Sequence, residues 1–196
     1  MDNSANVIDL PEDIKKATFS NIYKDDKKRL PIIKYFKEFI DTYLKEENPK
    51  GIYLHGSFGS GKTYLIASLF NEMAKKDIAS VMVYYPELLR SLKSSFGNDY
   101  EEKFTKLKTV PLLLLDDIGA ENTTNWSRDE VLAPLLQYRM EEHLPTFFTS
   151  NLTKEELELT LSNTNNGIDK IKARRIIERI NQLTVDLELI SKNRRN

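Results

Sequence analysis

The phosphate-binding pattern of glycine, four residues of any kind, glycine, lysine and then serine or threonine is present at residues 56–63. The loop follows a short apolar stretch at 52–54 and precedes residues 63–75, whose apolar side chains recur at helical spacing. Three of the seven glycines lie in this loop, where backbone N–H groups must approach phosphate oxygens without intervening side chains. The pattern predicts a nucleotide-binding loop between a strand and a helix; the alternative is a glycine-rich turn without a ligand.

Lys62 and Thr63 have separate predicted roles in this loop. We expect Lys62 to contact the β and γ phosphates of ATP as a mobile positive charge. We expect the Thr63 hydroxyl to ligate Mg²⁺, because this ion prefers a few oxygen ligands together with phosphate and water. The helix that begins after Gly61 would direct its N-terminal N–H groups at the same anion. The residues predicted to bind ATP or ADP are Gly56, Ser57, Phe58, Gly59, Ser60, Gly61, Lys62, Thr63 and Tyr64.

A second motif consists of the apolar run 112–115 followed by Asp116 and Asp117. In open α/β folds, ligands bind at the edge where such strands end. We expect Asp116 to hold Mg²⁺, directly or through water, and Asp117 to polarise the attacking water. An aspartate pair alone is more often a solvated strand end, but a preceding phosphate loop favours the catalytic interpretation. Asn151, at the end of the following strand, is expected to orient water or contact the γ-phosphate; the alternative is a plain turn asparagine.

Strands and helices alternate along the chain, which predicts the α/β class with a mostly parallel sheet covered by helices on both faces. Two helices are expected to begin at capping boxes, one formed by Ser127 and Glu130 and the other by Thr153 and Glu156. The predicted strands are 52–54, 79–84, 112–115 and 146–149, and the predicted helices include 30–47, 63–75, 86–92 and 127–140.

The composition restricts the class of protein further. A length of 196 residues with 40% hydrophobic residues suits one globular domain. The chain has no cysteine and only two histidines, His55 and His143, which excludes a disulfide framework and argues against a zinc site. Its net charge of -1 gives no global attraction to nucleic acid, so DNA contact requires a local basic surface. The sequence shows neither a signal-like N-terminus nor an apolar run of roughly 18 residues, so we expect a cytoplasmic protein without membrane contact.

Three segments, 56–63, 112–121 and 149–151, together resemble the AAA+ ATPases of the bacterial DnaI/DnaC helicase-loader family. Segments 126–132 and 137–140 look closest to the DnaI branch of Gram-positive bacteria. Many ATPases share the loop and the acid pair, whereas the Asp-Asp-Ile-Gly-Ala-Glu block and the arginine-containing segments after it are more particular. The resemblance therefore narrows the prediction from a nucleotide-binding protein to one family of ATPases.

This resemblance covers residues 17–196, which we expect to form one AAA+ ATPase domain, with residues 1–16 as an N-terminal arm or linker. It implies a P-loop NTPase fold with a central, mostly parallel five-stranded sheet flanked by helices. Only about 45 residues follow Asn151, so the helical lid common in AAA+ proteins is expected to be reduced or absent. Loaders of the DnaI type also carry an N-terminal helicase-binding domain with a cysteine-containing zinc site, and we expect that domain to be absent here.

The resemblance implies hydrolysis of ATP to ADP and phosphate with Mg²⁺, weak in the isolated domain. The implied partners are single-stranded DNA and the replicative hexameric DNA helicase, which the loader helps to place on that DNA during initiation of replication. Copies of the chain would form a homo-oligomer through the ATP site when assembled, whereas the domain alone would be a monomer. Two alternatives are an IstB-like transposition ATPase and a nucleotide-gated binding module with negligible turnover.

In this family an arginine of one subunit completes the ATP site of its neighbour. The matching stretch is 172–180, in which Arg179 is the first choice for that arginine, followed by Arg175 and then Arg174. Arg175 and Arg179 lie four residues apart and therefore share one face of a helix. The alternative is that these arginines pair with nearby carboxylates.

The resemblance also implies contact with single-stranded DNA through a helical insertion after the second strand, here about residues 86–108. Basic residues beside aromatic ones suit a surface on which bases stack; alternatively, the aromatic residues belong to the core. Residues 170–196, with eight Lys or Arg against three Asp or Glu, form a competing basic surface. That stretch includes Arg194 and Arg195, which are candidates for a sensor arginine or for a basic tail. The insertion carries Arg90, Lys93, Lys103, Lys106, Lys108, Phe96, Tyr100 and Phe104.

Four further side chains have weaker predictions. Glu121 is expected to be an exposed loop acid rather than a member of a polar network near the two aspartates. His55 is expected to be a packed strand residue, and His143 a residue at a helix end, where it suits the helix dipole. Trp126 is either a packing anchor or a contact for a partner.

Overall fold

The computed structural model describes residues 6–8, 12–19 and 27–190 of the chain. Its centre is a six-stranded sheet with the order β1-β3-β4-β5-β2-β8, and every neighbouring pair of strands is parallel. The strands of this sheet are β1 (Asn6–Ile8), β2 (Gly51–Gly56), β3 (Ser80–Tyr84), β4 (Leu112–Asp116), β5 (Thr146–Ser150) and β8 (Thr184–Leu189).

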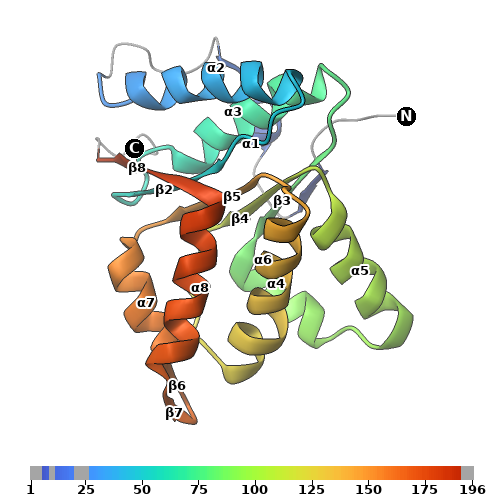
Figure 1. Ribbon diagram of the computed structural model, residues 1–196, viewed down its shortest axis with the longest axis vertical. Coiled ribbons are helices and arrows are strands. Elements are labelled where there is room, and N and C mark those ends of the chain that lie inside the picture. The colour runs from blue at the N-terminus through green and yellow to red at the C-terminus, as the bar shows by residue number, and fades with distance from the viewer. Residues whose placement is uncertain (1–5, 9–11, 20–26, 191–196) are drawn as a thin grey trace.

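Helices cover both faces of the sheet (Figure 1). Helices α2 and α3 lie over one face, and α4 to α8 lie on the other, with the small hairpin β6-β7 at the end farthest from the sheet. No helix in the described part of the chain is long and apolar enough to cross a bilayer. The remaining elements are α1 (Glu12–Lys15), α2 (Leu30–Leu44), α3 (Lys62–Ala74), α4 (Tyr85–Lys93), α5 (Gly97–Thr109), the π-helical segment η2 (Ser127–Leu132), α6 (Ala133–Glu141), α7 (Lys154–Ser162), β6 (Asn163–Thr164), β7 (Gly167–Ile168) and α8 (Lys170–Leu183).

Strand β4 shows why the sheet is buried on both faces. Its four leucines are completely buried, and alternate residues of a strand point to opposite faces. Leu112 and Leu114 belong to the hydrophobic core under α2 and α3, whereas Leu113 and Leu115 belong to the core under α4 to α8. The uninterrupted apolar run in the sequence therefore reflects a central parallel strand between two cores.

The α/β class and the four predicted strands are confirmed. Five strands of the sheet lie within residues 17–196, and the sixth, β1, lies within the predicted arm and pairs with β3. Strand β8, in which polar and apolar residues alternate, was not predicted from the sequence. After Asn151, the described elements α7, α8 and β8 pack into the main body, so these residues form no separate lid.

The two predicted capping boxes have different outcomes. At the start of α7 the box is present, since the Glu156 N–H donates to Thr153 Oγ1 at 3.2 Å and the Thr153 N–H donates to Glu156 Oε1 at 3.1 Å. The box between Ser127 and Glu130 was a wrong prediction. The Ser127 N–H instead donates to Thr124 Oγ1 at 3.0 Å, and the Thr124 N–H donates to Ser127 Oγ at 3.1 Å. Thr124 therefore caps a helical segment that begins at Asn125, before the predicted start.

Arg139 on α6 is a completely buried cation that holds several loops together. Its Nε donates to Thr146 Oγ1 at 2.8 Å, and its other nitrogens donate to backbone carbonyls that lie before β4 and β5. Burial lowers its pKa to about 9, so it stays protonated at neutral pH. The carbonyl acceptors belong to Leu107, Lys108, Val110, Pro111 and Pro145.

Replacement of this side chain, Arg139→Met, should reduce the free energy of unfolding by about 3 kcal/mol, because it leaves buried carbonyls without donors. Urea denaturation followed by circular dichroism measures the change. The control is Lys106→Met on the exposed surface of α5, which should stay within about 0.5 kcal/mol of wild type. A loss below about 1 kcal/mol for Arg139→Met would contradict a structural role for this hydrogen-bond network.

Candidate nucleotide site at the carboxyl edge of the sheet

The phosphate loop connects the end of β2 to the start of α3, as predicted. Its backbone requires glycine at two positions in particular. Gly56 has φ of 148°, and a Cβ added there would lie 1.9 Å from the carbonyl oxygen of Leu189 on β8. Gly61, the residue before α3, has φ of 96°, in a region that side chains disfavour. The loop that leads into the N-terminus of α3 therefore depends on glycine at positions 56 and 61, because a larger side chain would disturb its backbone conformation.

Lys62 joins the phosphate loop to the end of β5. Its side chain is 9% exposed, and its Nζ donates to the carbonyl oxygens of Gly56 at 3.2 Å and Ser57 at 2.8 Å. The same ammonium donates to Asn151 Oδ1 at 3.0 Å. The structure therefore brings the predicted lysine and the predicted asparagine into direct contact.

Asp116 is the buried acid at the centre of the site, with 5% of its surface exposed. Its Oδ1 accepts hydrogen bonds from Thr63 Oγ1 at 2.7 Å and from Thr149 Oγ1 at 2.6 Å. Burial raises the pKa of this carboxyl, and the two hydroxyl donors act in the opposite direction. The two predicted magnesium ligands are thus adjacent, and sequence reasoning missed Thr149, although it lies two residues before Asn151 on the neighbouring strand.

The oxygens of Thr63 and Asp116 fit Mg²⁺, which takes hydroxyl and carboxylate ligands together with phosphate and water. Among the residues that the structure describes, no group of three or more His, Cys, Asp or Glu side chains could hold a metal ion. A metal at this site would therefore depend on phosphate oxygens for part of its shell.

Asp117 follows directly but has different surroundings. Its φ of 59° is left-handed, a conformation that aspartate adopts more readily than most residues, and its N–H donates to Thr149 Oγ1 at 2.9 Å. The side chain is half-buried beside Tyr84. Burial raises the Tyr84 pKa, and the charge of Asp117 and a hydrogen bond to it contribute in the same direction. The turn after β4 therefore separates the two acids into one buried and one accessible carboxylate.

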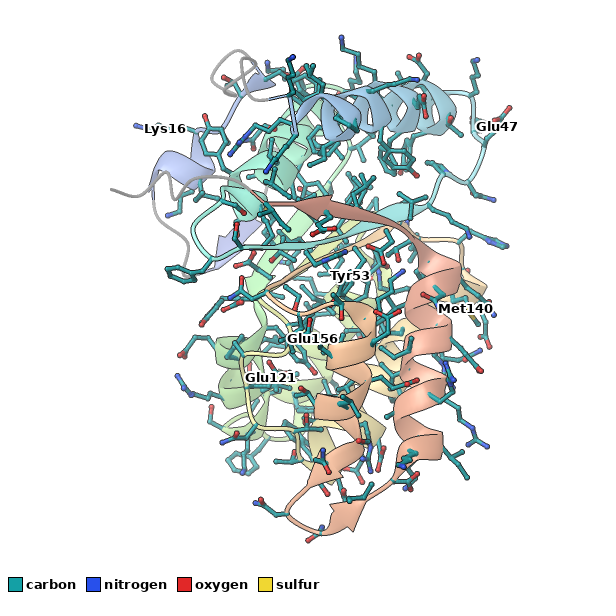
Figure 2. The ribbon with its side chains drawn as sticks, turned by 90° about the vertical axis from the view of Figure 1, so that its left-hand side faces the viewer. Lys16, Glu47, Tyr53, Glu121, Met140 and Glu156 are labelled. Carbon is teal, nitrogen blue, oxygen red and sulfur yellow. The ribbon has the colours of Figure 1, made fainter. Side chains whose placement is uncertain are left out.

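Glu121 lies near these acids and is not exposed, so the prediction of an exposed loop acid was wrong. It is half-buried, and its Oε2 accepts a hydrogen bond from the Gly119 N–H at 3.0 Å. Burial raises its pKa. Figure 2 shows Glu121 on the same side of the sheet as Tyr53, below the strands. The short loop after β4 folds back on itself, which a sequence pattern does not reveal.

A cavity of about 410 Å³ lies between α4 and the loop that follows β4. Tyr84 and Glu121 line it, which brings it next to the Asp117 network. Trp126 lines the same cavity and also packs against the core, which fits the predicted packing anchor; the alternative, a contact for a partner, stays a prediction. Arg90 and Lys93 on α4 also line it, as does Glu87, which forms an ion pair with Arg90, so the lining carries charges of both signs.

The insertion of residues 86–108 forms α4 and α5, and only some of its predicted DNA contacts are accessible. Phe96, between the two helices, is 81% exposed, whereas Phe104 is buried and stacks on Tyr100. Lys103 donates to Ser95 Oγ at 2.7 Å, so it has a structural role. Lys108 also has a structural role, since its Nζ lies 5.4 Å from the Phe104 ring centroid and 5.2 Å from that of Tyr138. Lys93 and Lys106 are exposed.

The three candidate arginines on α8 differ in their surroundings. Arg179 is half-buried, and its Nε donates to Gln137 Oε1 at 2.8 Å. Arg174 forms an ion pair with Glu158, with 3.3 Å between Nε and Oε1. Arg175 is exposed and has no hydrogen bond or ion pair with any residue that the structure describes. Arg194 and Arg195 lie outside the described residues.

The two histidines are where the sequence predicted them. His55 packs on β2 beside the Tyr53 ring, with 5.8 Å between the ring centroids, and its Nε2 lies 2.8 Å from Asp186 Oδ1. His143 lies in the turn after α6, with φ of 53°, and its N–H donates to the Met140 carbonyl at 3.3 Å.

Comparison with known proteins agrees with this geometry. The family model described as "IstB-like ATP binding protein" matches residues 34–188. The replicative helicase loader DnaI of Bacillus subtilis (strain 168) is 41% identical over 189 residues, which are 95% of this chain and 61% of that protein. The chain thus spans about three fifths of the length of that curated relative.

Solved structures give the same relationship. A crystal structure of DnaI superimposes with a TM-score of 0.85 and 43% identity, covering 98% of each chain. The crystal structure of the DnaC helicase loader has a TM-score of 0.75 and 19% identity, covers 91% of this chain and 99% of that one, and shows a common fold. The resemblance to the DnaI/DnaC type and the AAA+ P-loop fold are confirmed. The chain therefore belongs to the family of IstB-like ATP-binding proteins, and it is similar to the DnaI helicase loader.

Proposed function

We propose that this chain is the ATP-binding and ATP-hydrolysing part of a helicase loader that helps to deliver the replicative DNA helicase to single-stranded DNA in the cytoplasm when replication begins. The observation that carries the proposal is the meeting of Lys62, Asp116 and Asn151 at one sheet edge, from three separate elements. The relationship to a replicative helicase loader supplies the biological context.

The residues of the site would have separate roles in ATP hydrolysis. The N–H groups at the start of α3 and the Lys62 ammonium would bind the phosphates, and Thr63 and Asp116 would hold Mg²⁺. Bound Mg²⁺ would neutralise negative charge on the phosphates. Asp117, the accessible carboxylate, would polarise the attacking water. This assignment is supported by burial, since Asp116 is enclosed by two hydroxyl donors and Asp117 is not.

The hydrogen bond between Lys62 and Asn151 would be replaced when a nucleotide binds. Lys62 donates to two loop carbonyls and to Asn151 Oδ1, and phosphate oxygens are stronger acceptors for an ammonium than these neutral groups. When Lys62 turns to the phosphates, the Asn151 amide becomes free to orient water or to contact the γ-phosphate. Asn151 is exposed in the structure, as this role requires.

A neighbouring copy would complete the site with an arginine from α8. The surroundings favour Arg175 over Arg179, because Arg179 is held by Gln137 and Arg175 is exposed. We therefore rank Arg175 first, Arg179 second and Arg174 third. In such an assembly the subunits form a homo-oligomer through the ATP site, and the isolated chain is a monomer with an incomplete site.

Single-stranded DNA would contact the side of the molecule formed by α4 and α5. Phe96 offers an exposed ring for base stacking, and Lys93 and Lys106 offer charge for the phosphate backbone. Lys93 also lines the cavity beside Trp126, whose lining includes Tyr84 and Glu121 from the region next to Asp117, so bound DNA would lie close to the acidic turn after β4. Lys103 and Lys108 are excluded from the proposed surface because they bind within the protein.

The other two functions have less support. A transposition ATPase shares the ATP-binding region that the family model describes, but the relative with 41% identity is a helicase loader. A nucleotide-gated module would use the same loop with negligible turnover. Single-turnover hydrolysis, measured with and without single-stranded DNA and helicase, separates the proposals: absence of hydrolysis under every condition would favour the gated module.

Lys62→Ala should weaken ATP binding and reduce hydrolysis roughly 100-fold or more, because it removes the cation nearest the transferred phosphoryl group. Titration with a fluorescent ATP analogue and phosphate release measure the two effects. Lys75→Ala, at the opposite end of α3, is the matched control and should behave as wild type. Wild-type turnover in Lys62→Ala would refute the assignment of the site.

Arg175→Ala should reduce hydrolysis in the assembled complex roughly 1000-fold without changing ATP affinity, because the arginine would act on the site of its neighbour. Mixing Arg175→Ala with Lys62→Ala should restore partial activity. At some interfaces of the mixture an Arg175→Ala subunit would supply Lys62, and a neighbouring Lys62→Ala subunit would supply Arg175. Arg179→Ala should mainly reduce stability through loss of the Gln137 contact. If only Arg179→Ala abolishes hydrolysis while the protein stays folded, the ranking is wrong.

The pair Lys93→Ala and Lys106→Ala should reduce the slope of log affinity for single-stranded DNA against log salt by about 1.4, if each lysine contacts one phosphate. Phe96→Ala should weaken binding by about 1–3 kcal/mol with no change in that slope, because stacking is not ionic. Fluorescence anisotropy with an oligothymidylate measures both. Lys75→Ala with Lys76→Ala is the control of equal charge, and an equal effect from it would contradict a localised DNA surface.

A further inference from the structure

Arg29 reaches the phosphate loop from outside the motif. It immediately precedes α2, yet its Nη2 donates a hydrogen bond to the carbonyl oxygen of Ser60. The arginine is only 2% exposed, and its Nη2 would lie 3.0 Å from a Cβ added to Gly61. The guanidinium is therefore buried against the peptide that joins Ser60 to Gly61.

The hydrogen bond from Arg29 to the Ser60 carbonyl determines the direction in which the Gly61 N–H points. In a trans peptide, the carbonyl of one residue and the N–H of the next point to opposite sides. A donor fixed on the Ser60 carbonyl thus keeps the Gly61 N–H turned to the other side of the loop. Gly61 is the residue that precedes the first turn of α3, where N–H groups bind anions. Among the backbone hydrogen bonds of turns, loops and caps within the described ranges, none is donated by the Gly61 N–H.

The position of Arg29 is itself fixed by packing. Ile32 and Phe36 on α2 belong to the same core as Leu65 and Ile66 on α3. The carbonyl of Arg29 accepts a hydrogen bond from the Ile33 N–H at 2.9 Å, which continues the helical ladder. The arginine therefore stands at the N-terminus of a helix that shares its hydrophobic core with the helix of the phosphate loop.

We propose that Arg29 is a positioning residue of the nucleotide site, which holds the peptide between Ser60 and Gly61 so that the Gly61 N–H is directed at a bound phosphate. Its charge also lies behind that peptide and adds to the positive potential at the N-terminus of α3. A loop that is already held in the binding conformation loses less freedom when the ligand binds. This inference rests on the proposed function, since it requires the loop to bind ATP and ADP.

The test compares Arg29→Met, which keeps length but removes charge and donors, with Arg29→Lys, which keeps the charge without the planar fork. Arg29→Met should raise the Kd for fluorescent analogues of ATP and ADP roughly tenfold. The increase in Tm caused by each nucleotide at fixed concentration should shrink accordingly. Arg29→Lys should have an intermediate Kd. Lys75→Met is the control, because it removes one positive charge at the far end of α3, and it should retain the wild-type Kd.

The outcomes separate positioning from simple packing. If Arg29→Met melts at a lower temperature without nucleotide but keeps the wild-type Kd, Arg29 only stabilises the fold and the inference is overturned. If Arg29→Met does not fold, Arg29→Lys decides, and a wild-type Kd in that variant overturns the inference. If the wild-type protein binds neither nucleotide, the proposed function fails and this inference fails with it. Weaker binding in the Arg29 variants alone, with normal binding in Lys75→Met, supports the role.

Discussion

The site depends on the hydrogen bonds that the buried carboxylate of Asp116 accepts. A carboxylate with 5% exposure is costly unless hydrogen bonds compensate for lost water, and here Thr63 and Thr149 supply them at 2.7 Å and 2.6 Å. These three residues come from β4, α3 and β5, so satisfying one charge fixes the relative positions of three elements. That requirement aligns the phosphate loop, the acidic strand β4 and the strand β5, which Asn151 follows.

The strand order explains how residues far apart in the chain come together. Strand β2 pairs with β5, although β3 and β4 lie between them in sequence, and β5 pairs in turn with β4. Because all strands are parallel, the loops after β2, β4 and β5 leave the same edge of the sheet. This is the region where open α/β sheets bind ligands. The two faces of the sheet are covered by the two cores, which leaves this edge for polar side chains.

The sequence predicted the parts of the molecule whose signals are local. Continuous apolar runs such as 112–115 identify central strands, and the glycine spacing in 56–63 identifies the loop. Long-range contacts left no such signal. Thr149 and Arg29 act through partners 33 and 31 positions away, and neither contact follows from neighbouring residues. Strand β8 was missed because an edge strand with alternating polar side chains lacks an apolar run, and the cap at Thr124 was missed because a plausible box lay three residues later.

The packing of β8 against the first glycine of the loop has a consequence for the order in which the protein matures. The Leu189 carbonyl accepts the Ser57 N–H at 3.3 Å and occupies the space where a side chain on residue 56 would be. Strand β8, the last strand described, therefore packs directly against the phosphate loop. During synthesis on the ribosome, residues 56–63 emerge long before that strand. The loop can therefore form its contacts with Leu189 only after residue 189 has left the exit tunnel.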